Sequence, residues 1–103
     1  LDIALDIRHG SPTFGQWHSQ ALSASNGIAM WIPPGFAHGF MALTEGAVVS
    51  YKCDKHYSPA LARGVRCDDE ALGFNWPERV QLSPADRAWP VLAELPKYFT
   101  YKE

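Results

Sequence analysis

The chain has 103 residues, a formal net charge of −2, and a composition that is 47% hydrophobic and 13% aromatic. This length suits one small domain, and so apolar a composition excludes a disordered chain. The absence of a basic block disfavours nucleic acid as a partner, and no apolar run is long enough to span a bilayer.

The opening residues predict a pair of strands. Residues 1–8 alternate apolar and polar side chains with a period of two, which is typical of a half-buried strand. Residues 9–13 form a turn by composition, and residues 14–22 can supply the returning strand. Because the chain enters a strand pattern at Leu1 without a methionine, we expect that its beginning is missing.

The next signals surround a Pro- and Gly-rich stretch. Asn26-Gly27 is a hairpin signal, and residues 28–32 predict a short strand that runs into the sequence Trp-Ile-Pro-Pro-Gly-Phe-Ala-His-Gly-Phe at residues 31–40. The prolines fix φ and donate no hydrogen bond, whereas the glycines permit unusual backbone angles. We therefore expect a rigid, largely buried corner that carries one imidazole, His38.

The remaining pattern also favours strands over helices. Strands are predicted at residues 40–43, 47–52 and 65–67, with one helical turn at residues 68–72 that ends at Gly73. Ser83, Pro84 and Asp86 predict a helix start, and residues 97–103 read as a loosely held tail. Five or six short strands between turns indicate an antiparallel sandwich or barrel.

His38 has two interpretations that its spacing alone does not separate. It is either a polar group at a pocket wall or a histidine that bonds a backbone carbonyl in a packed corner. Metal binding is disfavoured because no second histidine lies two residues away and the other histidines lie in separate segments. Cys53 and Cys67 are too few for a disulfide scaffold, so we expect reduced thiols in a cytoplasmic protein.

Two further residues could carry proton-transfer chemistry. Tyr51 ends the most β-rich run, where it is either a general acid or an ordinary strand aromatic. Asp86 follows the Ser83 cap by three positions, where its carboxylate either accepts helix-start amides or orients a histidine.

An ordered series of motifs resembles a known family. The series begins with Asp6-Ile7-Arg8, Ser11-Pro12-Thr13-Phe14-Gly15-Gln16-Trp17, Leu22-Ser23-Ala24 with Asn26, Trp31-Ile32-Pro33, and Gly35-Phe36-Ala37-His38-Gly39-Phe40. It continues with Tyr51-Lys52, Tyr57-Ser58-Pro59, Asp69-Glu70-Ala71 with Gly73, Trp76-Pro77, and Leu82-Ser83 with Asp86. The series resembles the dTDP-4-dehydrorhamnose 3,5-epimerase family, the RmlC-type cupins.

The resemblance implies an all-β, antiparallel jelly-roll barrel with short C-terminal helical turns. Residues 1–95 would form an N-terminally incomplete domain and residues 96–103 a tail. The family acts as a homodimer without metal or organic cofactor on a dTDP-4-keto-6-deoxyhexose. It removes the protons at C3 and C5 through an enolate and returns them on the opposite face.

The resemblance also implies roles for single residues. Tyr51 matches the acid, and Asp86 matches the partner of the base histidine. His38, Lys52 and Tyr57 match substrate-binding positions. The family's Arg-Gly-Leu-His motif, which holds the base, does not occur in this chain, so no base is assigned.

Two functional hypotheses remain open, and a metal-dependent cupin is disfavoured. One is the C-terminal portion of an epimerase that is inactive alone. The other is a truncated, non-catalytic module for sugar-nucleotide binding or oligomerisation. These residues alone should exchange no proton at C3 or C5 and should self-associate.

Overall fold

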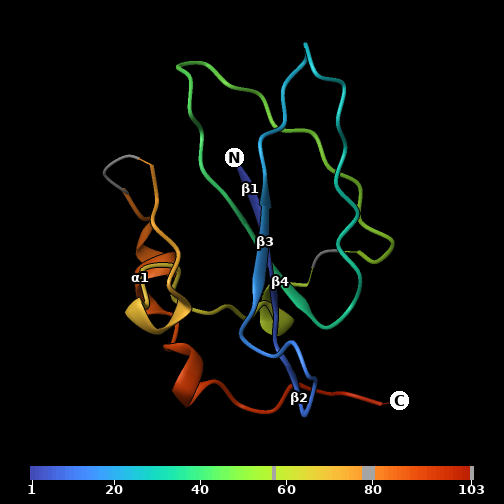
Figure 1. The fold of residues 1–103 in the computed structure, drawn as a ribbon, viewed down its shortest axis with the longest axis vertical. Coiled ribbons are helices and arrows are strands. Elements are labelled where there is room, and N and C mark those ends of the chain that lie inside the picture. Colours follow the sequence, from blue (N-terminus) through green and yellow to red (C-terminus); the bar gives the residue numbers. More distant parts are fainter. Residues whose placement is uncertain (57, 78–80, 103) are drawn as a thin grey trace.

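A three-stranded antiparallel sheet forms the centre of the fold. The computed structural model describes residues 1–56, 58–77 and 81–102. In these residues the sheet has the strand order β3 (Trp17–Gln20), β1 (Asp2–Asp6) and β4 (Phe36–Phe40). Figure 1 shows α1 (Pro84–Ala88) and neighbouring helical turns to one side of this sheet.

The central strand β1 follows the alternation predicted for it. Ile3 and Leu5 point to one face, whereas Asp2, Ala4 and Asp6 point to the other. On the apolar face Leu5 joins a buried core that also contains Ile7 and Leu95. Burial of these side chains favours the strand, because each removes apolar surface from water.

The carboxylate of Asp6 is the most buried polar group of the sheet, with the residue 1% exposed. It accepts hydrogen bonds from the backbone nitrogen, Nε and Nη2 of Arg8 at 2.9, 3.0 and 2.9 Å. The hydroxyls of Ser11 and Thr13 also donate to it, at 2.7 and 2.5 Å. Bonding to Arg8 lowers the pKa of the Asp6 carboxyl far below its ordinary value and outweighs the opposing effect of burial.

The chain continues from β1 into a second, smaller sheet. Strand β2 (Arg8–His9) pairs in parallel with β5 (Phe99–Thr100), and the backbone nitrogen of Tyr101 donates to the carbonyl of His9 at 2.9 Å. The prediction of a loosely held tail at residues 97–103 is therefore wrong for β5. Pairing partners that lie far apart in sequence leave no local signal.

The short helices confirm the capping signals. Ser83 caps α1, its hydroxyl accepting from the backbone nitrogen of Asp86 at 3.1 Å. The predicted turn at residues 68–72 is the 3-10 helix η2 (Glu70–Leu72), capped by Asp69 and ended by Gly73 at a φ of 67°. Two further 3-10 turns are η1 (Pro59–Leu61) and η3 (Leu92–Glu94).

Several predicted strands do not form. Residues 28–32, 47–52 and 65–67 are all described, and none of them is in a strand. The strand predicted at residues 40–43 instead starts at Phe36 and ends at Phe40. Among the described residues no strand pairs with the run at residues 47–52, and Val48 is 92% exposed. β-propensity describes a fit to a pleated sheet, so it forms no strand without a partner strand.

The predicted preference for antiparallel sheet is confirmed for the main sheet, and the helical segments are short. Closure into a jelly-roll barrel stays a prediction. None of the helices in the described parts of the chain has the length and apolar character needed to cross a bilayer.

We expect Asp6→Asn to lower the free energy of unfolding by about 3 kcal/mol, because it removes the buried charge that Arg8 faces. Urea denaturation at pH 7 measures this loss. A matched control is Asp68→Asn, whose carboxylate pairs with Arg66 Nε at 2.5 Å but is 43% exposed. We expect this surface pair to contribute less than about 1 kcal/mol.

The stability difference between the wild-type chain and Asp6→Asn should also depend on pH. Folding lowers the pKa of the Asp6 carboxyl from 3.8, its value in the unfolded chain. The ionised carboxylate therefore stabilises the native state at pH values above 3.8, and this contribution is lost as the pH falls below that value. The difference in free energy of unfolding between the wild-type chain and Asp6→Asn should therefore shrink below about pH 4. A difference that stays constant from neutral pH to pH 2 would contradict the assignment.

Candidate functional site

A histidine and a carboxylate meet on the polar face of the sheet. His38 lies directly opposite Ala4 across the β1–β4 pair, and Asp2 is its diagonal neighbour. The Nε2 atom of His38 forms a hydrogen bond with Oδ1 of Asp2. Since an ionised carboxylate can only accept, Nε2 is the nitrogen that carries the proton. The side chains are 34% and 13% exposed, respectively, so solvent or a ligand can reach the imidazole.

The local sequence explains why His38 faces this way. A turn at Gly35, with a φ of 90°, precedes β4, and His38 is the third residue of the strand. The prediction that residues 31–40 form one buried corner is therefore wrong. The turn ends at Gly35, His38 lies within a strand, and Trp31 is 79% exposed. Strand alternation then places Phe36, His38 and Phe40 on one face.

The polar face of the sheet borders an open groove, which we call the His38 groove. Its volume is about 1590 Å³, and its lining includes Asp2, Phe36, His38, Tyr51 and Lys52. Tyr51 is 72% exposed, and its segment carries no regular structure. The structure thus brings three of the predicted site residues, His38, Tyr51 and Lys52, to one groove. Tyr57 lies outside the described residues.

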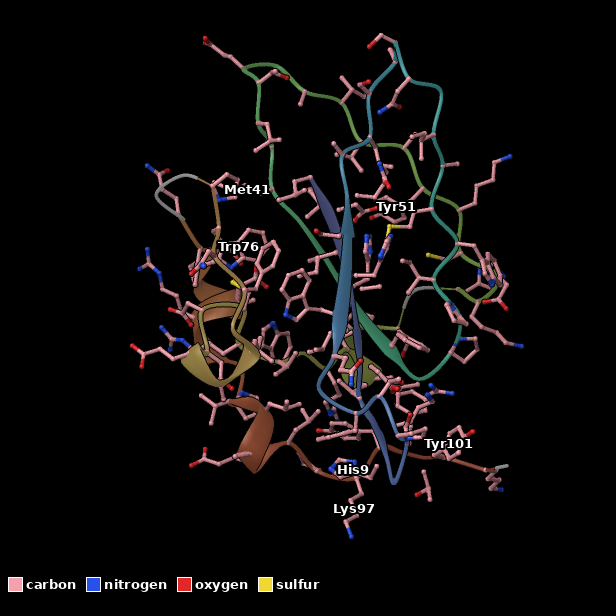
Figure 2. The ribbon with its side chains drawn as sticks, in the orientation of Figure 1. His9, Met41, Tyr51, Trp76, Lys97 and Tyr101 are labelled. Atoms are coloured by element: carbon pink, nitrogen blue, oxygen red, sulfur yellow. The ribbon has the colours of Figure 1, made fainter. Side chains whose placement is uncertain are left out.

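Asp86 lies on a different groove, which we call the tryptophan groove. Its volume is about 1140 Å³, and its lining includes Trp17, Trp76, Trp89 and Asp86 as well as His38. Figure 2 shows Trp76 and Tyr51 on opposite sides of the sheet. Oδ1 of Asp86 accepts a hydrogen bond from Nε1 of Trp89 at 3.2 Å. The bond found for this carboxylate thus orients an indole and does not involve a histidine.

Asp2 is the residue that sequence reasoning missed. In the sequence Asp2 is only a polar position of the first strand, and nothing local connects it to a histidine 36 residues later. The register of β1 against β4 is what joins them. The alternation of both segments, had their pairing been known, would have placed Asp2 and His38 on one face.

The described residues contain no group of three or more histidine, cysteine, aspartate or glutamate side chains that could hold a metal ion. Cys53 and Cys67 are free cysteines, as predicted. Burial raises the pKa of the Cys67 thiol, so this group is kept in the protonated, unreactive form.

Comparison with known proteins identifies the family. A family model described as dTDP-4-dehydrorhamnose 3,5-epimerase matches residues 1–94. The chain belongs to this family. It is 49% identical over 103 residues to the dTDP-4-dehydrorhamnose 3,5-epimerase of Sinorhizobium fredii, covering 98% of this chain and 53% of the relative. The chain therefore spans about half the length of the curated relatives that it matches.

Solved structures agree with this assignment. The Legionella pneumophila epimerase RmlC in complex with dTDP-4-keto-L-rhamnose matches 99% of this chain and 56% of its own, with a TM-score of 0.83 and 41% identity. ChmJ, a 3'-monoepimerase from Streptomyces bikiniensis in complex with dTDP-quinovose, matches 90% of this chain and 48% of its own. Its TM-score is 0.84 and its identity 37%. These values confirm the predicted resemblance to RmlC-type epimerases.

We expect Asp2→Asn to change the ring signals of His38, because an amide can donate as well as accept and no longer requires a proton on Nε2. Nitrogen-resolved NMR of the imidazoles should show the His38 Nε2–H signal in the wild-type chain and its loss in the variant. His18, which lies on the same face opposite Ala4, is the internal control and should not change. An unchanged His38 signal would show that Asp2 does not orient the ring.

Proposed function

We propose that this chain carries the sugar-contacting part of a dTDP-4-dehydrorhamnose 3,5-epimerase. The observation that carries the proposal is the Asp2–His38 pair at the groove that Tyr51 and Lys52 also line. Membership of the family and the dTDP-sugars bound by the Legionella and Streptomyces relatives support a dTDP-4-keto-6-deoxyhexose as substrate.

The proposed role of His38 follows from its hydrogen bond. Asp2 holds Nε2, so Nδ1 is the ring nitrogen left to meet a ligand. When the ring is protonated, Nδ1 can donate to the oxygen at C4, where negative charge develops as a proton leaves C3 or C5. A donor placed before the reaction stabilises the enolate more than it stabilises the ketone. The carboxylate of Asp2 fixes the orientation of the ring through its hydrogen bond with Nε2.

Tyr51 and Lys52 complete the proposed site. The Tyr51 hydroxyl would return a proton to carbon on one face of the enolate, and the Lys52 ammonium would pair with an anionic group of the substrate. We assign Tyr57 to substrate binding from the family motif alone. Asp86 would orient the base histidine of the family, and that histidine does not lie among the motifs of this chain.

The proposal also covers the closure of the fold, the oligomeric state, the location and the cofactor requirement. We propose a jelly-roll barrel over residues 1–95, a homodimer, a cytoplasmic location and a reaction without metal or organic cofactor. Large apolar side chains at the surface, Trp31 and Val48 above all, support burial against further protein.

The alternative is a non-catalytic module that binds a sugar nucleotide. The exposure of Tyr51 and the bond between Asp86 and Trp89 favour it, since neither residue is held for proton transfer in this chain. Activity measurements separate the two.

We expect an active enzyme when this chain replaces the matched part of the Sinorhizobium fredii relative, because that protein supplies the remaining half of its length. Deuterium incorporation at C3 and C5 of dTDP-4-keto-6-deoxyglucose in heavy water measures the reaction. The 103-residue chain alone should bind the substrate without exchange.

Tyr51→Phe in the chimera should slow reprotonation, at C5 above all, by about 100-fold or more while leaving substrate affinity nearly unchanged. Tyr98→Phe is a matched control, because Tyr98 lies outside the His38 groove. A folded chimera that binds dTDP but exchanges no proton would favour the non-catalytic module. Equal losses of binding and rate in Tyr51→Phe would make that tyrosine structural.

A further inference from the structure

The side chain of Arg8 contacts three other segments of the chain. Its Nε and Nη2 donate to the two carboxylate oxygens of Asp6 in a fork. The centre of its guanidinium lies 4.8 Å from the ring centroid of Phe36, at the start of β4, and 5.1 Å from that of Tyr101, just after β5. Arg8 therefore joins the central strand to the strand that carries His38 and to the C-terminal strand.

The aliphatic part of Arg8 lies on the backbone of Gly35. A Cβ atom at Gly35 would approach Cγ of Arg8 to 2.6 Å and Cδ to 2.8 Å. These are atoms near the root of the side chain, and the fork on Asp6 prevents them from swinging away. The adjacent Ile7 nitrogen donates to the carbonyl of Gly35 at 3.1 Å. Arg8 and Gly35 thus define one close contact where β4 begins.

This contact lies next to the first residue pair of the β4–β1 pairing. Phe36 pairs with Asp6, His38 with Ala4, and Phe40 with Asp2. In the part of the chain that the structure describes, β1 is the neighbour of β4 in the sheet. A slip of one residue would turn His38 to the opposite face, away from Asp2. The register of this single pairing therefore decides whether the His–Asp pair forms.

We propose that Arg8 is a positioning residue for the His38 groove. Its contacts with Asp6, Gly35 and Phe36 set the β1–β4 register that brings His38 to Asp2, and the ring of Tyr101 also lies close to the guanidinium. Figure 2 shows Tyr101 and His9 at the end of the sheet away from Tyr51, so Arg8 acts on the site through the strand. The inference rests on the proposed function only in treating His38 as a substrate contact.

The test is the Nε2–H signal of His38 in nitrogen-resolved NMR of the 103-residue chain, which needs no substrate. Gly35→Ala should abolish or shift this signal, because the new methyl group displaces Arg8. The matched control is Gly10→Ala. Gly10 has the same φ of 90°, but nothing lies within 4 Å of the new Cβ. Both variants place a Cβ at the same positive φ, so a difference between them reports the contact with Arg8.

A second, milder variant keeps the inference testable if Gly35→Ala does not fold. Arg8→Lys retains the positive charge beside Asp6 but loses the fork and the planar stacking. It should also shift the His38 signal while His18 stays unchanged. Unaltered His38 signals in the folded variants, or an equal effect of Gly10→Ala, would overturn the inference. An inactive chimera with these NMR results intact would instead count against the proposed function alone.

Discussion

The carboxylate of Asp6 accepts hydrogen bonds from Arg8, Ser11 and Thr13 while it is almost completely shielded from water. A buried carboxylate without donors would be costly, so the turn that follows β1 has to close around it. The backbone of Asp6 adds two further bonds, because its nitrogen donates to Gln16 and its carbonyl accepts from Gly15. These bonds connect Asp6 to the residues just before β3, and Asp6 also pairs with Phe36 at the start of β4, the strand that carries His38.

Local signals allowed part of the fold to be predicted. The alternation in β1 and the Ser83 cap of α1 depend on residues that are close together in the sequence, and both predictions are confirmed. Residues 47–52 have strong β-propensity but form no strand, because propensity alone forms no strand without a partner strand. The pairing of β5 with β2 joins segments about 90 residues apart, and no local sequence pattern predicts it.

In the candidate site, too, features that depend on local sequence could be predicted and features that depend on strand pairing could not. The Pro- and Gly-rich context of His38 marks this residue in the sequence, but no local pattern marks Asp2, because the contact between the two depends on strand register. Asp86 was recognised as a helix-start residue, and the structure adds its bond to Trp89. The roles of Tyr51, Lys52 and Asp86 come from ordered family motifs and remain proposals. One His–Asp pair on a polar sheet face is the chemistry that the described residues themselves assemble.

Hydrogen exchange, measured residue by residue in the native chain, tests most directly whether the Asp6 cluster organises the structure. We expect the amides of Asp6, Ile7 and Gly15 to exchange slowest, since their hydrogen bonds surround the buried carboxylate and open only on global unfolding. Exchange of these three amides as fast as that of residues 47–52 would contradict this expectation.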